Sequence, residues 1–277
     1  MSSFKSSVSV THIGTATALL QIDNVTFLTD PFFSPSGTEW NLPIVLLKVS
    51  QDPAIKPEDL PPIDAVLLSH EDHPDNLDEV GRQVLEGKKV FTTKDGANNI
   101  GGKAICTGLA AGEKTTLVAG GKTFEIIATP AEHAPIGECI GFIITSPEFG
   151  TTNHLPNAIY FSGDTIYNQD VANSLKGFHV SLALLNLGRA AVAFDGSELL
   201  AITMDGKQAS RLIKDANIEN VVPMHYEGWG HFSEGRDLAT RAFAEAGVSE
   251  KVFWLPRGER KVIFDGSTAF SNSKEGL

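Results

Sequence analysis

Two histidines and several acids crowd the end of an apolar run in "LLSHEDHPDNLD", residues 67–78. The same arrangement, an apolar run followed by a small residue and then His or Asp, recurs around His133, Asp164 and His225. Strand ends and the loops beyond them are where open sheets place ligand groups. Imidazoles and carboxylates that meet at one sheet edge would bind a divalent transition metal such as zinc. The pattern therefore predicts a metal centre.

A lone histidine at a strand end is more often a hydrogen-bonded structural residue than a metal ligand, so the prediction depends on recurrence. We assign the structural role to His154 and His179, which stand outside the recurring pattern. His12 opens a turn after the first apolar run, and we expect it to support the metal edge without binding the ion.

Strands and helices that could position these residues alternate along the chain. Period-two and fully apolar runs predict strands, broken by Gly and Asp-Asn turns, at 7–14, 17–23, 25–31, 63–70, 88–93, 122–130, 139–146, 157–165, 180–188, 220–226 and 251–256. Helical spacing of apolar residues predicts helices within 76–87, 205–217 and 234–247. The simplest packing is one domain over residues 1–277, with sheets inside and helices outside.

Three segments fit no strand or helix. Residues 31–62 are rich in proline and contain the apolar patch "WNLPIVLLKV", and residues 188–202 are mostly small and apolar. Long loops in a compact domain are usually functional, so both are expected to line a pocket. Residues 268–277 are expected to form a flexible tail.

The charge of the chain limits its partners. A net charge of −12 over 277 residues opposes binding to phosphate backbones, and no Lys/Arg cluster suggests a basic groove, so no nucleic acid partner is expected. No stretch approaches the roughly 20 apolar residues of a membrane span, and no signal-peptide core is present. Two cysteines without C-x-x-C spacing suit a reducing compartment. We expect a cytoplasmic protein with a small-molecule substrate and no membrane partner, and the sequence leaves a homo-oligomer open.

The metal motifs carry a family resemblance. "SHEDHPDNLD", "TPAEH", "FSGDT" and "PMHYEGWGHF" follow the order of the metal motifs of the metallo-β-lactamase superfamily, and "THIGTATALLQIDNVTFLTDP" is similar to its first strands. The chain resembles this superfamily over residues 8–260, including its ascorbate-6-phosphate-lactonase-like branch and uncharacterised fungal and bacterial metallo-hydrolases. The resemblance implies an α/β fold, a four-layer αββα sandwich with metals at one edge. It also implies that His133 binds a first metal, Asp164 bridges two metals and His225 binds the second.

The first motif departs from the usual H-x-H-x-D-H of the superfamily, and two registers compete. Aligning the tail places His73, Asp75 and Asn76 on H-x-D-H, with His70 one residue early. Aligning the head makes Asp72 the second ligand instead.

We favour the tail register because "DNLD" then matches the start of the following helix. Pro74 would occupy the first helical turn, and Asp75 would lie near the helix N-terminus, where a carboxylate is favoured. The predicted metal ligands are then His70, His73, Asp75, His133, Asp164 and His225.

Asn76 stands where the superfamily has a histidine in this register. Its amide oxygen is a weaker zinc ligand than imidazole. The chain is therefore expected to hold one or two Zn²⁺ ions, with Mn²⁺ as an alternative in the second position. One ion on the three histidines and Asp164 would still activate water.

The resemblance also implies an activity. We expect a metal-dependent hydrolase that opens a small, largely neutral cyclic amide or ester, a lactam or lactone, by attack of a metal-bound hydroxide. Asp75 would orient or deprotonate the water, and His231 would either donate to a substrate oxygen or pack its loop. Apolar pocket walls are suggested by Phe32, Phe33, Trp40, Leu42, Trp229 and Phe232. Ordinary core packing is the alternative for the aromatic residues, and for Phe32 and Phe33 it is the favoured one.

Other functions stay open at this point. A phosphodiesterase or nuclease of the same fold would want a basic groove. A non-catalytic member that binds a metal or ligand is compatible with Asn76. A di-iron redox role is the weakest option, because no flavin-binding partner domain is recognisable in the chain.

Overall fold

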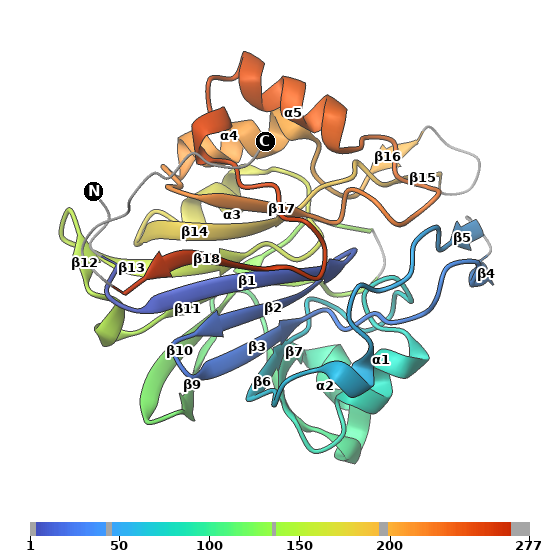
Figure 1. The fold of residues 1–277 in the computed structure, drawn as a ribbon, viewed down its shortest axis with the longest axis horizontal. Helices are drawn as coiled ribbons and strands as arrows, with labels where there is room; N and C mark the ends of the chain where they lie inside the picture. Colours follow the sequence, from blue (N-terminus) through green and yellow to red (C-terminus); the bar gives the residue numbers. More distant parts are fainter. Residues whose placement is uncertain (1–3, 43–45, 135–136, 194–198, 267–277) are drawn as a thin grey trace.

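The computed structural model describes residues 4–42, 46–134, 137–193 and 199–266, and its centre is a pair of facing sheets (Figure 1). The first sheet has the order β18-β1-β2-β3-β6-β7-β8, and its strands are β1 Ser7–Gly14, β2 Thr17–Ile22, β3 Val25–Thr29, β6 Ala65–Leu67, β7 Lys89–Thr93, β8 Ile105–Leu109 and β18 Arg260–Asp265. The second has the order β17-β14-β13-β11-β10-β9, with β12 on β13, and its strands are β9 Lys114–Ala119, β10 Lys122–Pro130, β11 Ile140–Thr145, β12 Thr151–Thr152, β13 Leu155–Phe161, β14 His179–Asn186 and β17 Val221–Met224. The first three strands form the predicted antiparallel meander.

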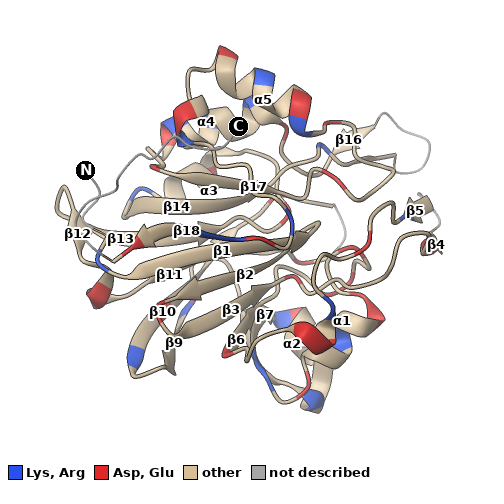
Figure 2. Ribbon diagram, in the orientation of Figure 1, with Lys and Arg blue, Asp and Glu red and all other residues tan. Residues whose placement is uncertain are grey.

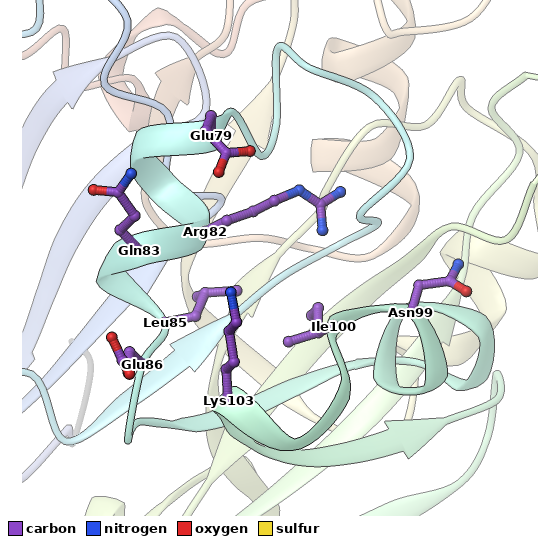
Figure 3. A pocket seen from close by; sticks show the side chains of 8 residues that line it. All are labelled: Glu79, Arg82, Gln83, Leu85, Glu86, Asn99, Ile100 and Lys103. Carbon is purple, nitrogen blue, oxygen red and sulfur yellow. The ribbon is translucent and has the colours of Figure 1, made fainter.

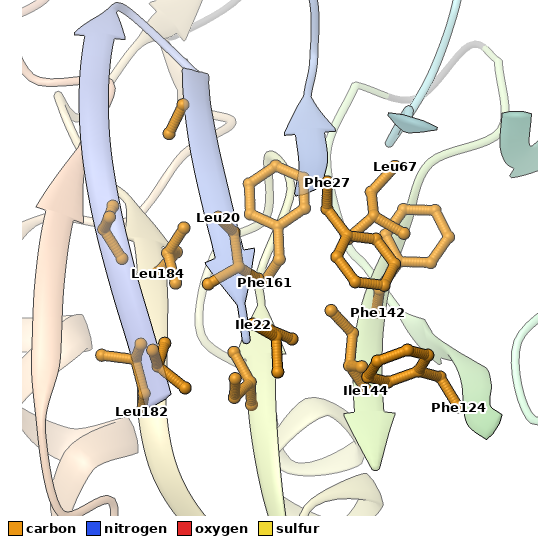
Figure 4. Close-up of a cluster of buried hydrophobic side chains, with 14 of the residues drawn as sticks. Leu20, Ile22, Phe27, Leu67, Phe124, Phe142, Ile144, Phe161, Leu182 and Leu184 are labelled. Carbon is orange, nitrogen blue, oxygen red and sulfur yellow. The ribbon is translucent and has the colours of Figure 1, made fainter. Parts of the chain in front are cut away.

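The apolar runs of the sequence become the core between the sheets (Figure 4). Side chains of the first sheet, such as Leu20, Phe27 and Leu67, meet Phe124 and Phe161 of the second. Phe27 and Phe124 pack edge to face with ring centroids 5.6 Å apart, a favoured aromatic arrangement. This core fixes the two sheets relative to each other, and with them the loops at their shared edge.

Helices cover the outer face of each sheet (Figure 1). Over the first lie α1 Glu79–Val84 and α2 Lys94–Ile100, and over the second lie α3 Gln169–Ser174, α4 Gly206–Asp215 and α5 Arg236–Glu245. Short 3₁₀ turns occupy Pro57–Asp59, Gly101–Lys103, Pro147–Phe149 and Ser249–Lys251. The order helix, sheet, sheet, helix confirms the predicted four-layer sandwich. Among the described residues, every helix is too short or too polar to cross a bilayer.

The two segments expected as loops contain short hairpin strands at the same edge of the molecule (Figure 1). Residues 31–62 include β4 Glu39–Asn41 paired with β5 Leu46–Lys48, and residues 188–202 include β15 Ala191–Val192 paired with β16 Leu200–Ala201. Residues 43–45, 194–198 and the predicted tail 268–277 lie outside the described residues.

The start of α1 corrects the sequence prediction. The helix begins at Glu79, and its cap is Asp78, whose Oδ1 accepts from the Gly81 N–H at 2.6 Å. Pro74 and Asp75 lie in a preceding turn, so the prediction that they occupy the first helical turn and the helix N-terminus is wrong. The reason is long-range: Asp78 Oδ2 also accepts from the Ser34 hydroxyl at 2.5 Å, which ties the cap to a distant loop.

Two further local features follow from packing. Residues 251–256 were predicted as a strand, but Lys251 ends a 3₁₀ turn, Val252 makes only an isolated bridge with Val221, and residues 253–256 are irregular. Gly81 has to be glycine, because a Cβ there would lie 1.8 Å from the Pro31 carbonyl oxygen. That close approach lets α1 and the segment preceding it sit directly against the end of β3.

Candidate metal centre

Three histidines from different loops converge on one point. His70 follows β6, His73 lies in the turn before α1, and His133 follows β10. Nδ1 of His73 lies 3.0 Å from Nε2 of His70 and 3.1 Å from Nε2 of His133. Ligand nitrogens at 2.0–2.1 Å from a tetrahedral zinc would stand about 3.3 Å apart, so the spacing of this group fits such an ion.

Outer hydrogen bonds set the orientation of two of these rings. The Ser69 hydroxyl donates to Asp30 Oδ2 at 2.7 Å, which leaves its oxygen free to accept from Nδ1 of His70 at 2.9 Å. Nδ1 of His133 donates to the Ile202 carbonyl at 2.7 Å. Both Nε2 atoms therefore present lone pairs toward His73, as ligands supported by outer partners do.

A second group consists of Asp75, Asp164 and His225. Its ligand atoms lie within 4.8 Å of one another, and all three residues are buried. Nε2 of His225 stands 3.5 Å from Asp164 Oδ2 and 3.9 Å from Asp75 Oδ2. Asp164 Oδ1 accepts from the Asn186 amide at 2.7 Å, which leaves its other oxygen to face the group.

Local backbone geometry places the second group. Asp164 follows β13 in a turn where Gly163 has a φ of +55° and where a Cβ would meet the Ser69 Cβ at 2.6 Å. His225 directly follows β17 with a φ of +56°, and its N–H donates to the Thr15 carbonyl at 2.8 Å. The buried His12 ring contacts the same carbonyl at 2.9 Å, so it supports the loop that carries His225, in line with its expected role.

The two groups have different electrostatics. Burial lowers the pKa of His70 well below its usual value and lowers that of His133, so both rings are neutral near pH 7. For His225, burial opposes protonation, but the carboxylates of Asp164 and Asp75 outweigh it and raise its pKa to about 9. Burial likewise opposes ionisation of Asp75, yet the neighbouring imidazole of His225 holds its pKa well below the usual range.

The residues present fit a divalent ion at both groups. Three ring nitrogens that meet at one point cannot all be hydrogen-bond donors, and a shared ion would use their lone pairs. Nε2 of His225 is buried and has no hydrogen-bond partner among the described residues, as a ligand atom would. The first group is nitrogen-rich, and the second offers two carboxylates and one imidazole, donors that suit zinc or a harder ion such as manganese.

The structure places His73, and not Asp72, beside the other two histidines, as the tail register predicts. His73 belongs to the three-histidine group, whereas the Asp72 carboxylate is packed against Gly137, where a Cβ would meet Oδ2 at 2.2 Å. Asn76 is fully buried and donates from Nδ2 to Asp30 Oδ2 at 3.0 Å, and its Oδ1 has no partner among the described residues. The position that bears a histidine in the superfamily motif here serves as a brace to Asp30.

A cavity of about 250 Å³ opens onto both groups. Its polar floor contains His73, Asp75, His133 and Asp164, with Asp72 and His231 beside them. The walls are apolar and come largely from the two hairpins: Leu42, Leu47, Pro74, Ala134, Ala190, Val192 and Ile202. The segments expected to line a pocket thus supply most of its apolar wall.

All five aromatic residues predicted as walls lie elsewhere. Of that set, only Leu42 lines the cavity. Phe33 packs in the cluster beneath α1. The other four, Phe32, Trp40, Trp229 and Phe232, pack behind the wall around Leu47 and Val49, with Phe32 and Trp229 ring centroids 5.0 Å apart. A sequence pattern identifies an aromatic but not which layer of the wall it joins.

His231 lies on a loop that is anchored at two points. Backbone bridges join Val49 to Trp229 and Ala190 to Phe232, on either side of it. Its Nε2 stands 3.9 Å from Asp75 Oδ2, and its buried Nδ1 has no partner among the described residues. The ring packs on Trp229 and Phe232 and also lines the cavity, so the packing role is seen in the structure and the donor role stays a prediction.

The sequence reasoning missed Asp30, Ser69 and Asn186, which brace the ligands. Ser69 directly precedes the predicted ligand His70, Asp30 stands in the "TDP" of the opening motif, and Asn186 only ends an apolar run, so their strand-end positions are the only sequence signal they carry. Burial raises the pKa of Asp30 to about 7 against the hydrogen bonds from Ser69.

A separate cavity of about 390 Å³ lies between α1 and α2 and contains none of the candidate ligands (Figure 3). Arg82 and Asn99 in its wall both bind the Glu71 carboxylate, at 2.5 and 2.6 Å. Glu71 directly follows His70, so this contact braces the ligand loop from the helix side.

Comparison with known proteins places the chain. A sequence profile described as "Beta-lactamase superfamily domain" matches residues 25–226, most of the chain. The chain belongs to the metallo-β-lactamase superfamily. A UPF0173 metal-dependent hydrolase of Pyrococcus furiosus is 28% identical over 217 residues, 74% of this chain and 85% of that protein. This similarity groups the chain with the metal-dependent hydrolases of the superfamily, and the lactonase-like branch stays a prediction.

A second relative is the N-acyl-phosphatidylethanolamine-hydrolyzing phospholipase D 1 of Caenorhabditis elegans, 32% identical over 144 residues. The match covers 47% of this chain and only 39% of that protein. Among solved structures, isothiocyanate hydrolase from Delia radicum gut bacteria has a TM-score of 0.75 at 23% identity, over 91% of this chain and 98% of that one. A metallo hydrolase from Ignicoccus hospitalis has a TM-score of 0.68 at 23% identity, over 93% and 99%. Both agree with the fold described above.

Proposed function

We propose that this chain opens a small, largely neutral cyclic amide or ester as a metal-dependent hydrolase. The observation that best supports this substrate class is the cavity wall, which is apolar and has no Lys or Arg among its described lining residues. Beyond the bound ions themselves, such a wall offers no counter-charge to an anionic phosphate, and burying that anion against apolar side chains carries a desolvation cost. A lactam or lactone ring, with one polar carbonyl and an apolar body, meets no such cost.

The chain's own residues have distinct tasks in this proposal. A bound divalent ion would lower the pKa of water toward about 7 and polarise a carbonyl. His70, His73 and His133 would hold a first ion, with Asp75, Asp164 and His225 for a second. The apolar walls keep bulk water from the ring and orient the carbonyl toward the floor.

Asp75 and His231 are assigned the proton chemistry. Because its pKa is held low, Asp75 is a better orienter of water than a base. His231 is neutral near pH 7, since burial lowers its pKa, so its ring can donate a hydrogen bond from one N–H to a substrate oxygen, while the proton that the leaving nitrogen or oxygen takes comes from the attacking water.

The first test is metal content and turnover in tag-free protein. Elemental analysis should give one or two zinc or manganese ions per chain. A panel of γ-butyrolactone and β- and γ-lactam substrates should then show hydrolysis that chelation removes and metal restores. Turnover that survives both chelation and His73→Ala would contradict the proposal, and absence of metal after reloading would favour a non-catalytic binding role.

Phosphodiester hydrolysis is the second candidate, and the nematode phospholipase D relative is what favours it. Against it, Lys and Arg lie dispersed among Asp and Glu along the helices and β18 rather than around the cavity (Figure 2). Including bis(p-nitrophenyl) phosphate in the same panel separates the two. We keep a small-molecule substrate, without nucleic acid or membrane and in the cytoplasm, as part of the proposal.

A further inference from the structure

The β15–β16 ribbon has one face that continues the cavity wall outward. Val192 pairs with Leu200 and Ala191 with Ala201, and the Ile202 N–H donates to the Ala190 carbonyl at 2.8 Å. Directly paired residues of an antiparallel ribbon share a face, and the face alternates at each residue. One face therefore carries Ala190, Val192, Leu200 and Ile202.

Three of these four residues already line the cavity, and the fourth lies beyond it. Val192 and Ile202 are each 7% exposed, and Ala190 is 1% exposed. Leu200 is 46% exposed and is outside the cavity lining. An exposed leucine that prolongs the apolar wall of a candidate active site is different from one scattered singly on the surface.

We propose that Leu200 forms an outer subsite for an apolar chain or ring joined to the hydrolysed group. This deepens the proposed function and rests on it: the substrate class becomes an amphiphilic carbonyl compound whose apolar part extends past the cavity. The hydrolysed carbonyl would sit at the polar floor, and the apolar part would run along Val192 and Ile202 to Leu200.

The same hairpins supply matched controls. Leu199 is 73% exposed and directly precedes β16, and it is not among the residues that line the cavity. Leu46 is 53% exposed on β5, but its neighbour Leu47 is the residue that lines the cavity. Both are as exposed as Leu200 and close to the same edge, yet neither continues the wall.

The experiment measures binding, so it does not depend on turnover. Acetohydroxamate, hexanohydroxamate and decanohydroxamate would be titrated calorimetrically into zinc-loaded wild type, Leu200→Ser and Leu199→Ser. In wild type, affinity should rise by up to about fourfold for each methylene that reaches apolar surface. Leu200→Ser should lower the decano-to-aceto affinity ratio about tenfold, and Leu199→Ser should keep it within twofold of wild type.

Every outcome decides the inference. Equal ratios in the two variants, or no dependence on chain length in wild type, would overturn the outer subsite. Failure of acetohydroxamate to bind would remove the metal centre, and the subsite would fall with it. A clear length series lost only in Leu200→Ser, together with no turnover of γ-alkyl-butyrolactones, would keep the subsite and reject the lactone reaction.

Discussion

The two candidate ligand groups, 70/73/133 and 75/164/225, differ in how much they need an ion to be stable. In the first, burial keeps His70 and His133 neutral, and three nitrogens converge without enough protons to satisfy one another. In the second, two carboxylates face an imidazole whose pKa is raised to about 9. The proton on this imidazole therefore already offsets part of the negative charge of the carboxylates, as a metal ion would. Protons do not compete with a metal ion for His70 and His133 in the first group. In the second group the metal ion must displace the proton of His225.

This difference gives the two groups separate signatures. The first should bind zinc tightly and with little pH dependence, because its ligands are mainly neutral imidazoles with braced tautomers. The second should bind more weakly, since its proton competes and Asn76 replaces an imidazole. Metal stoichiometry between one and two would follow from this asymmetry rather than from partial loss during purification.

The largest expected effect comes from removing a ligand of the first group. His73→Ala should cost more than about hundredfold in zinc affinity, since even outer partners of ligands cost 10–100-fold. Asp72→Ala should change zinc affinity less than fivefold, because its carboxylate packs on Gly137 and is outside both ligand groups. Competition with a chelating dye measures both, and the reverse order would overturn the tail register.

The fold was largely predictable, because its signals are local. Long apolar runs gave β1, β2, β3, β10, β13 and β14, and helical spacing gave α4 and α5. The start of α1 was not predictable, since both Asp75 and Asp78 are plausible caps and the choice depends on Ser34, a contact 44 residues away in sequence. The run at 251–256 failed because strand propensity needs a partner, and only Val252 finds one.

In the candidate site, too, local features could be predicted and contacts between distant segments could not. The six predicted ligands fall into two groups in the structure, because each stands at a strand end that the sheets bring to one edge. Their role as ligands stays a prediction until an ion is measured. The bracing of His70 by Ser69 and Asp30, and the outward position of Leu200, depend on pairings between distant segments that no local pattern records.

A second test of the asymmetry is the pH dependence of the second ion. His225 must lose its proton to bind, so below its pKa of about 9 the affinity of the second group should fall about tenfold per pH unit. From pH 8 to pH 6 the second ion should weaken about hundredfold, while the first changes little. In metal-free protein the same raised pKa stabilises the fold fully below about pH 6.5, and this stability is lost as pH rises through about 9.

Titration of zinc at pH 6, 7 and 8 in buffers of different ionisation enthalpy measures both affinities and the proton released. One proton released with the second ion and none from His70 or His133 is the expected result. Equal pH slopes for both ions would show that the groups do not differ in this way.

Restoring the missing imidazole should sharpen the comparison further. Asn76→His would add a nitrogen ligand beside the second group and should tighten the second zinc by about tenfold. Asn76→Ala is the matched control, since it removes the same bond to Asp30 without adding a ligand. If both variants bind the second ion equally weakly, position 76 is only a brace to Asp30 and does not face the ion.

The smallest expected effect concerns the brace from the helices. Arg82→Gln should lower the free energy of unfolding by about 1 kcal/mol, because Glu71 is nearly buried and loses a charged donor, while exposure of Arg82 limits the loss. Lys114→Gln, which removes the exposed pair with Glu125, should cost less than about 0.5 kcal/mol. Urea unfolding of metal-free protein measures both. Since Asn99 still holds Glu71, first-group zinc affinity should fall only a few-fold, and a collapse of zinc binding in Arg82→Gln would mean that the helices, rather than Ser69 and Asp30, position His70.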